Sequence, residues 1–567
     1  MDWNVFKGFT AHIDYALSFS NYFQKRADTP TGAAYDFQTG KDIGRYYVAD
    51  NVGVSDNNTT NYKTQLNGRL QYETTIAQNH NIGAMFVYSE EYWHTRSTGA
   101  SRNDRIHPST SEINAALTNV QSNSGSSASE GLRSYIGRMN YSAYDKYLLE
   151  FSFRVDGSSK FIKGHQYGFF PTVAVGWRFT EEEFLKKYLS SWLSSGKLRA
   201  SWGKLGDNSG VDRFEQLETL TAMNYMSSDV VKGFVNKKMI NKDLSWEVST
   251  DINVGLDLGF LNNRLRTEID FYNRLRTGMN RPSQMSIHLT GAYSAPRANI
   301  GDLLNRGLEL NLTWKDKIGN VEYSVNLNGA YNRTVLKEWN EFLSRGWVYL
   351  DMPYHFLYVY ENNGIAQTWQ DIYNNTPQGL SPGDVIRKDL NGDGIIDGKD
   401  KKAYPNIQRD RPTTTYGITL QAAWKGFDIS MLFNGGLGRK DFWLTDFNNT
   451  AFADRRYAST WDHWTEPWSL ENRGGEWPRL GTSTDRSDNS YWLYNMNYLR
   501  MKNIMLGYNL PKKLLSKISM TNLRIYASAE NLFTVTQYPG LDPEKKNSAR
   551  DLYPINRSFS IGLNVSF

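Results

Sequence analysis

Residues 558–567 read Ser-Phe-Ser-Ile-Gly-Leu-Asn-Val-Ser-Phe, so an apolar side chain follows a small or polar one at every second position. A repeat of two places the two sets of side chains on opposite faces of a β-strand. The same alternation recurs at 9–19, 147–155, 252–260 and 308–314. Several such segments match the roughly 9–11 residues that a tilted strand needs to cross a bilayer. The sequence therefore predicts an all-β chain with strands long enough to span a membrane.

The composition agrees with a transmembrane barrel. The 567 residues have a mean hydropathy of −0.60, and no run approaches the ~18 apolar residues that a membrane helix needs. This test does not detect barrel strands, because the polar residues that face the lumen lower the mean hydropathy of each strand. Aromatic residues make up 14% of the chain, as in the interfacial girdles of barrels, although sugar-binding β-proteins are also rich in them.

The charge and the absence of cysteine exclude some functional classes. With 64 basic and 59 acidic residues the chain is nearly balanced, so we expect no nucleic-acid partner. The chain has no cysteine, which excludes disulfides and thiolate metal sites. Met1 is followed by neither a basic nor an apolar segment, so no signal peptide is evident and we expect a processed chain or a fragment.

The connections alternate between short turns and long loops, which is the pattern of outer-membrane barrels. The long ones fall near 25–58, 97–130, 207–245, 276–302, 334–412 and 438–494. We place sixteen strands near 8–24, 59–76, 81–96, 131–142, 147–157, 167–179, 196–206, 246–260, 264–275, 303–315, 321–333, 413–424, 427–437, 495–510, 521–536 and 556–567. The pattern also predicts extracellular long loops, a periplasmic C-terminus, a bulge near Lys502, a short helix within 181–195 and a mobile loop at 121–130.

An ordered set of short motifs resembles the SusC/RagA group of TonB-linked outer-membrane transporters. The motifs include Arg-Val-Asp-Gly-Ser-Ser-Lys-Phe at 154–161, Gly-Phe-Phe-Pro at 168–171, Asn-Arg-Gly-Leu-Glu at 305–309, Glu-Asn-Leu-Phe at 530–533 and the terminal Phe567. The resemblance covers nearly the whole chain. It implies an outer-membrane location, energised import of oligosaccharides or peptides, a SusD-like surface lipoprotein as partner, and drive from TonB through a plug domain and TonB box.

The resemblance also implies a larger barrel. Family members have about 22 strands and a plug domain, so sixteen strands leave six missing, and neither the plug nor the TonB box is visible here. We therefore expect residues 1–567 to be the C-terminal portion of a transmembrane antiparallel β-barrel, surrounded by outer-membrane lipid and derived from a truncated or split protein. The alternative is a passive pore or a glycan-binding β-protein without energised transport.

One motif in the long loop 334–412 predicts a calcium site. Residues 389–400 read Asp-Leu-Asn-Gly-Asp-Gly-Ile-Ile-Asp-Gly-Lys-Asp, which has the spacing of oxygen ligands that a hard cation needs. The candidate ligands are Asp389, Asn391, Asp393, the carbonyl of Ile395, Asp397 and Asp400. A bound Ca²⁺ would rigidify the loop. The alternative is a solvated loop built from Asn-Gly and Asp-Gly turns.

The aromatic-rich loop 438–494 contains the candidate ligand-binding residues. They are Trp461, His463, Trp464 and Trp468, whose rings are suited to stacking on sugars or to a partner contact. The alternative is that these rings pack within the loop itself. No catalytic motif is present: the chain lacks a zinc-binding His-Glu-x-x-His, a nucleophile elbow and a phosphate-binding loop. We therefore expect no enzymatic activity.

Overall fold

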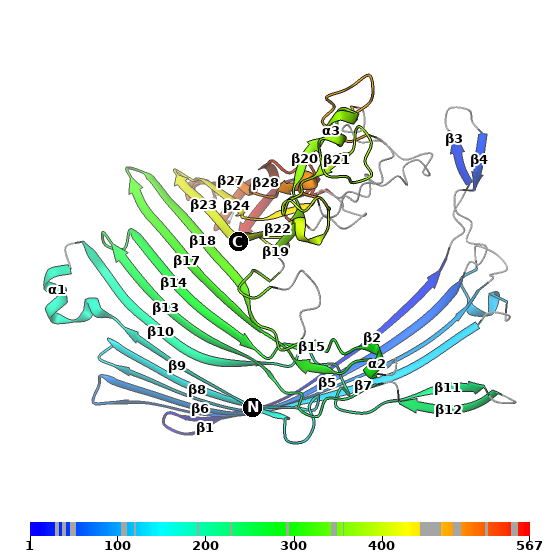
Figure 1. Ribbon diagram of the computed structural model, residues 1–567. Helices are drawn as coiled ribbons and strands as arrows, with labels where there is room; N and C mark the ends of the chain where they lie inside the picture. The colour runs from blue at the N-terminus through cyan, green and yellow to red at the C-terminus, as the bar shows by residue number, and fades with distance from the viewer. Residues whose placement is uncertain are drawn as a thin grey trace. The chain divides into compact units, whose positions relative to one another are not determined.

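The computed structural model describes most of the chain, and Figure 1 shows it as a ribbon. The described residues are 1–28, 33–36, 41–45, 53–103, 110–117, 121–189, 192–226, 230–236, 238–290, 294–341, 349–354, 356–442, 466–479, 489–515, 520–545 and 554–566. The chain divides into two compact units. The first unit comprises Met1–Val173, Gly203–Ser249 and Gly278–Ile300, and the second comprises the remaining residues up to Phe567.

Long antiparallel strands dominate the first unit, and each pairs with the next one along the chain. They are β1 (Asp2–Phe6), β2 (Phe9–Ala27), β5 (Val54–Ile76), β6 (His80–Arg102), β7 (Gln121–Ala143) and β8 (Tyr147–Ser158). A hydrophobic core cluster of this unit contains Phe161, Phe170, Val211, Leu244 and Trp246.

The second unit repeats the same up-and-down pattern. Its strands are β14 (Leu265–Thr277), β17 (Asp302–Ile318), β18 (Val321–Glu338), β23 (Thr414–Trp424), β24 (Phe427–Leu437), β27 (Tyr498–Asn509), β28 (Asn522–Thr536) and β29 (Ser558–Ser566). Three more long strands are β9 (Tyr167–Trp177), β10 (Leu193–Asp207) and β13 (Glu247–Phe260).

Short elements occupy the connections. The strands are β3 (Ala33–Asp36), β4 (Lys41–Arg45), β11 (Leu220–Met226), β12 (Val230–Asn236), β15 (Asn280–Pro282), β16 (Arg297–Asn299), β19 (Phe356–Tyr360), β20 (Asn362–Ile365), β21 (Val385–Arg387), β22 (Lys401–Gln408), β25 (Lys440–Phe442) and β26 (Leu493–Asn495). The helices are η1 (Ile113–Ala115), η2 (Phe179–Glu181), α1 (Glu183–Leu189), α2 (Ile287–Thr290), α3 (Trp369–Tyr373), η3 (Gly398–Asp400), η6 (Ser490–Trp492) and α5 (Lys512–Leu515). Among the described residues, no helix combines the length and apolarity required to cross a membrane.

All sixteen predicted strands are confirmed, and the chain is almost entirely β. The predicted bulge is confirmed as well, because the pairing registers of β27 with β24 and with β28 both shift around Lys502. The helix predicted within 181–195 is present but shorter, since α1 ends at Leu189 and β10 begins at Leu193. The strand β1 was not predicted.

The prediction of a mobile loop at 121–130 is wrong. These residues form the first part of β7 and pair with β6, from Gln121 opposite Arg102 to Glu130 opposite Trp93. The Ser-rich composition has little strand preference of its own. The long partner strand supplies the hydrogen bonds that override it.

The two faces of the strands differ in polarity, as the alternation predicts. On one face of the first unit, Asp14, Asn67 and Ser89 lie opposite one another on three neighbouring strands and form a chain of hydrogen bonds. The other face carries exposed apolar side chains, such as Phe86 and Phe151. A polar lumen face and an apolar lipid face are what a membrane barrel requires.

Candidate functional site

The candidate functional site is a folded cluster of loops in the second unit, which we call the loop platform. It comprises the described residues 356–413, 438–442, 466–479, 489–497 and 537–545. Its core contains the buried side chains of Leu357 and Val359 from one long loop and of Phe442 and Trp492 from another. In Figure 1 the small antiparallel strand pairs β19–β22 and β20–β21 lie together with α3 in this part of the unit. These loops therefore have a hydrophobic core of their own.

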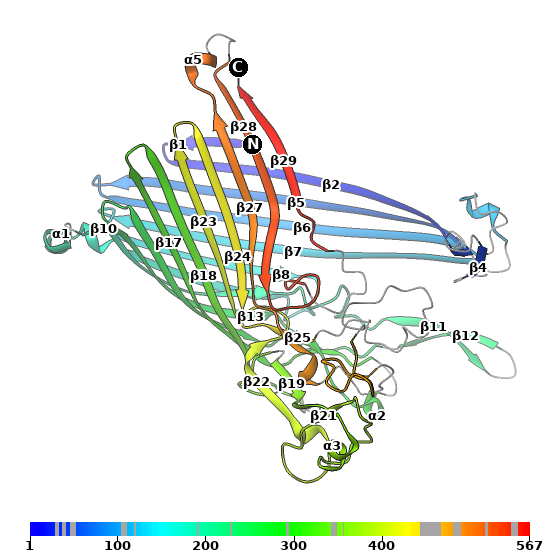
Figure 2. The same cartoon turned by 90° about the horizontal axis from the view of Figure 1, so that it is seen from above.

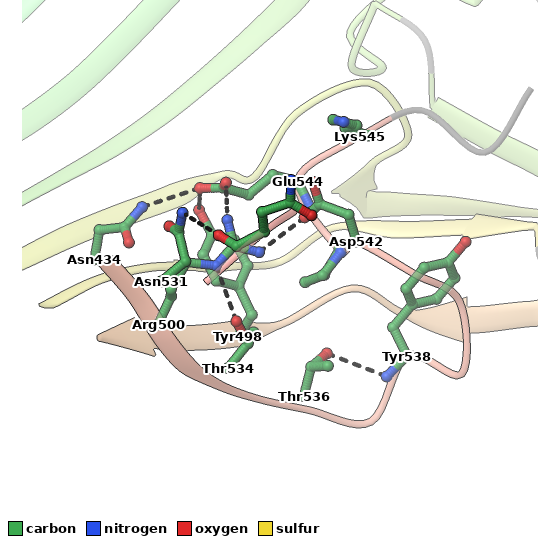
Figure 3. A network of polar contacts seen from close by, with 12 residues as sticks. Asn434, Tyr498, Arg500, Asn531, Thr534, Thr536, Tyr538, Asp542, Glu544 and Lys545 are labelled. Carbon is green, nitrogen blue, oxygen red and sulfur yellow. Dashed lines mark hydrogen bonds and ion pairs between the residues drawn. The ribbon is translucent and has the colours of Figure 1, made fainter. Parts of the chain in front are cut away.

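A buried arginine at the start of β27 binds the acidic side chains of residues 537–545 (Figure 3). Arg500 and Asp542 have side chains that are 3% and 1% exposed, and the Nη2–Oδ1 distance is 2.9 Å. Arg500 also forms an ion pair with Glu544, whose Oε1 accepts a hydrogen bond of 2.6 Å from the Tyr498 hydroxyl. The side chain of Arg500 thereby ties this loop segment to the strand ends.

A second buried arginine binds the main chain of the same loop. Arg439, only 2% exposed, donates to the carbonyl oxygens of Arg409, Pro543, Glu544 and Lys545 at 3.0–3.2 Å. Its Nη2 also lies 3.4 Å from Oδ2 of Asp441. Guanidinium groups suit this role because they present five donors in a fixed fork.

The predicted ligand-binding residues have different fates. Trp461, His463 and Trp464 lie outside the described residues. Trp468 is 7% exposed, and its indole Nε1 donates to Oε1 of Gln367 at 2.9 Å. Its ring covers Gly383, where an added Cβ would come within 2.5 Å of the indole. The structure places Trp468 in the packing of the platform, so its ligand role stays a prediction.

An aromatic pair that the sequence analysis did not single out is exposed on the platform. Trp369 and Tyr373 are 55% and 76% exposed, and their ring centroids lie 6.4 Å apart on α3. The helix begins at a capping box in which Thr368 and Asp371 satisfy each other's main-chain amides. A hydrogen bond from the Thr368 amide lowers the pKa of Asp371. The Thr-x-x-Asp spacing, with aromatic residues four positions apart, is the signal that identifies this pair.

The predicted calcium loop forms a compact turn in which main-chain amides bind the carboxylates. Asp389 accepts from the amides of Gly392 and Gly394 at 2.6 and 2.9 Å. Asp400 is buried and accepts from the amides of Leu390 and Asp397 at 2.9 and 2.8 Å. Across the described residues, no three or more His, Asp or Glu side chains converge as metal ligands. The six predicted ligands thus stay a prediction.

The Asp400 carboxylate has a lowered pKa, chiefly because the Asp397 amide donates to it. A lowered pKa means that the loop is stabilised above the ordinary value of 3.8 and loses this contribution as the pH falls below it. The carboxylate is therefore expected to hold the loop closed at neutral pH.

We expect Asp400→Ala to open this loop, because at least two amides lose their acceptor. Trypsin should then cleave after Lys402 about ten times faster than in the wild type, as expected when closing hydrogen bonds are lost. Asp400→Asn is the matched control, since it keeps one acceptor oxygen and should show an intermediate rate. Equal cleavage rates in all three proteins would contradict this role for Asp400.

Comparison with known proteins gives consistent matches. Residues 1–532 match the family described as "TonB dependent receptor-like, beta-barrel". The chain is 28% identical to TonB-dependent receptor P3 of Formosa agariphila, over 98% of this chain and 59% of that protein. It is 30% identical to TonB-dependent receptor SusC of Bacteroides thetaiotaomicron, over 77% of this chain and 44% of that protein.

A solved structure shares the fold. The structure of the RagAB peptide transporter superimposes with a TM-score of 0.81 at 22% identity, over all of this chain and 61% of that one. This chain therefore spans about six-tenths or less of the length of the relatives it matches.

Proposed function

The chain belongs to the TonB-dependent receptor-like β-barrel family of the outer membrane, and from this premise we propose that it forms the barrel wall and outer loops of a SusC/RagA-type nutrient importer. The expected resemblance to that group is confirmed. The observation that carries the proposal is the loop platform, whose own core and two buried arginines hold loops at one end of the strands. A rigid set of loops is what a receptor needs to present a ligand to its lumen.

The finer parts of the proposal concern substrate and partners. We propose that the imported nutrient is an oligosaccharide or a peptide, held between the loops and a SusD-like lipoprotein, with TonB acting through a plug domain. SusC and the RagAB peptide transporter support this assignment by their similarity. The exposed pair Trp369 and Tyr373 offers rings for stacking on a sugar or on a partner surface.

Two measurements test the proposal. The chain should appear in the outer-membrane fraction and migrate faster on a gel before heating than after it. A water-soluble monomer would contradict a membrane barrel. In cells, labelled oligosaccharides or peptides should accumulate only when TonB is present. Accumulation that persists without TonB would indicate the alternative, a passive pore.

Calcium binding by residues 389–400 belongs to the same proposal. The support is the complete ligand spacing. The main-chain amides now bound to Asp400 would have to be released for it to ligate a cation. Millimolar Ca²⁺ is expected to slow trypsin cleavage after Lys402, and Asp389→Asn should remove this protection. Identical rates with Ca²⁺ and with a chelator would refute the site.

A further inference from the structure

One end of β7 has a partner strand on only one side. β7 pairs with β6 along its whole length, from Gln121 to Ala143, but it pairs with β8 only from Leu132 to Ala143. Figure 2 shows β7 running on beyond the end of β8. Within the described part of the chain, residues 121–130 have no strand on this second side. They form a free strand edge, which we call the β7 edge.

The direction of the main-chain groups on the β7 edge follows from Gly131. Its carbonyl oxygen accepts from the Ser159 amide at 3.0 Å, and its own amide donates to Oγ of Ser159 at 2.9 Å, so both groups point away from β6. Antiparallel strands alternate in this respect at every residue, and the register with β6 has no bulge. The amides and carbonyls that face outward therefore belong to Gln121, Asn123, Gly125, Ser127 and Ser129.

The β7 edge lacks the usual protection against strand pairing. Exposed edges are normally blunted by lysine, proline, a bulge or a covering segment. Residues 121–129 read Gln-Ser-Asn-Ser-Gly-Ser-Ser-Ala-Ser, with neither charge nor proline, and 121–127 are exposed. The first charged side chain is Glu130, which pairs with Lys160 and Arg213. The main chain of this edge is open to an added strand.

We propose that the β7 edge binds extended peptides by adding them to the sheet as a further strand. Main-chain hydrogen bonds provide the affinity in this mode of recognition, and side-chain pockets provide the specificity. The side chains of 121–129 are small or polar on both faces, so the edge would accept peptides of many sequences. This proposal rests on the proposed function, which places the first part of β7, residues 121–130, outside the cell and makes a peptide a suitable nutrient.

A peptide fits this edge better than a folded protein does. Stable protein interfaces are centred on buried aromatic or aliphatic anchors. No large hydrophobic side chain is exposed between Trp93 and Arg102 or between Gln121 and Leu132. The neighbouring strands thus offer main-chain groups but no apolar anchor.

The test uses the full chain in detergent and a fluorescein-labelled peptide, Lys-Thr-Val-Thr-Val-Thr-Val-Thr-Lys. Fluorescence anisotropy should show binding to the wild type. Ser127→Pro removes an outward amide but no bond to β6, because proline is tolerated on a free edge. This variant should weaken binding about tenfold. Ser127→Ala keeps the amide and should bind as the wild type does.

Chemical variants of the peptide test the main-chain mode. Methylating every second amide leaves one peptide edge intact and should lower the affinity by about twofold, since one of two orientations is lost. Methylating all amides should abolish binding. Heat-modifiable migration of Ser127→Pro would show that the variant still folds.

Several outcomes would overturn the site. They are no binding to the wild type, equal binding to Ser127→Pro, and tolerance of the fully methylated peptide. A dimer that Ser127→Pro dissociates would assign the edge to a second copy of the chain, and binding only of a folded partner would assign it to that partner. Both results would refute a peptide site. The peptide-binding assay requires neither TonB nor a plug, so a negative result would leave the proposed import function standing. A water-soluble chain would instead refute the import function.

Discussion

Replacing Arg500 with alanine is expected to detach residues 537–545 from the strand ends and to destabilise this part of the protein by about 3–5 kcal/mol. The cost arises because Asp542, with 1% of its side chain exposed, would keep a negative charge without its cationic partner. One oxygen of this carboxylate, Oδ2, already has no hydrogen-bond partner. Among the residues that the structure describes, no other cationic side chain forms an ion pair with Asp542.

Trypsin cleavage after Lys545 measures this detachment, because Arg439 holds the Lys545 carbonyl oxygen and a protease can bind this segment only after it unfolds locally. Lys317→Ala is the matched control, since its ion pair with Glu322 is solvent-exposed and should contribute less than about 1 kcal/mol. The double variant Arg500→Met with Asp542→Asn should be more stable than Arg500→Met alone, because it removes the stranded charge. If the two variants were equally labile, an unpaired Asp542 would not be the cause.

The strands could be predicted from sequence because each side of a barrel strand meets a different solvent. Lipid and lumen impose alternation on segments such as 558–567, and no distant partner is needed to recognise it. The start of β7 could not be predicted in this way. Both faces of residues 121–130 are polar, and they are held in a strand by β6, whose register is a property of the folded chain.

The candidate site was predictable only where its signal is local. The 389–400 loop and the capping box of α3 depend on spacings within a dozen residues, so both motifs can be recognised in the sequence. The platform depends on contacts between distant segments. Arg500 meets Asp542, and Trp468 meets Gln367, across 42 and 101 residues respectively. A charged residue in a strand and a tryptophan in a loop gave no sign of being buried.

Replacing Arg439 with methionine is expected to release the same segment through its main chain. Three carbonyl oxygens of this segment, and that of Arg409, lose their donor, and each buried carbonyl left unpaired costs about 1–3 kcal/mol. Arg439→Lys keeps the charge but replaces the five-donor fork with a single ammonium. Trypsin should therefore cleave this variant after Lys545 at an intermediate rate. Cleavage of Arg439→Lys at the wild-type rate would show that charge alone holds the segment.

The combination of both changes separates two ways of anchoring a loop. Arg439 binds the carbonyls of 543–545, and Arg500 binds the side chains of Asp542 and Glu544. If the segment detaches as a unit, either substitution releases it. Trypsin should then cleave the double variant Arg439→Met with Arg500→Ala only slightly faster than the more labile of the two single variants. Independent anchors would give effects that add. Strong coupling is expected because the five bound groups lie within four consecutive residues, which leaves no hinge between the two arginines.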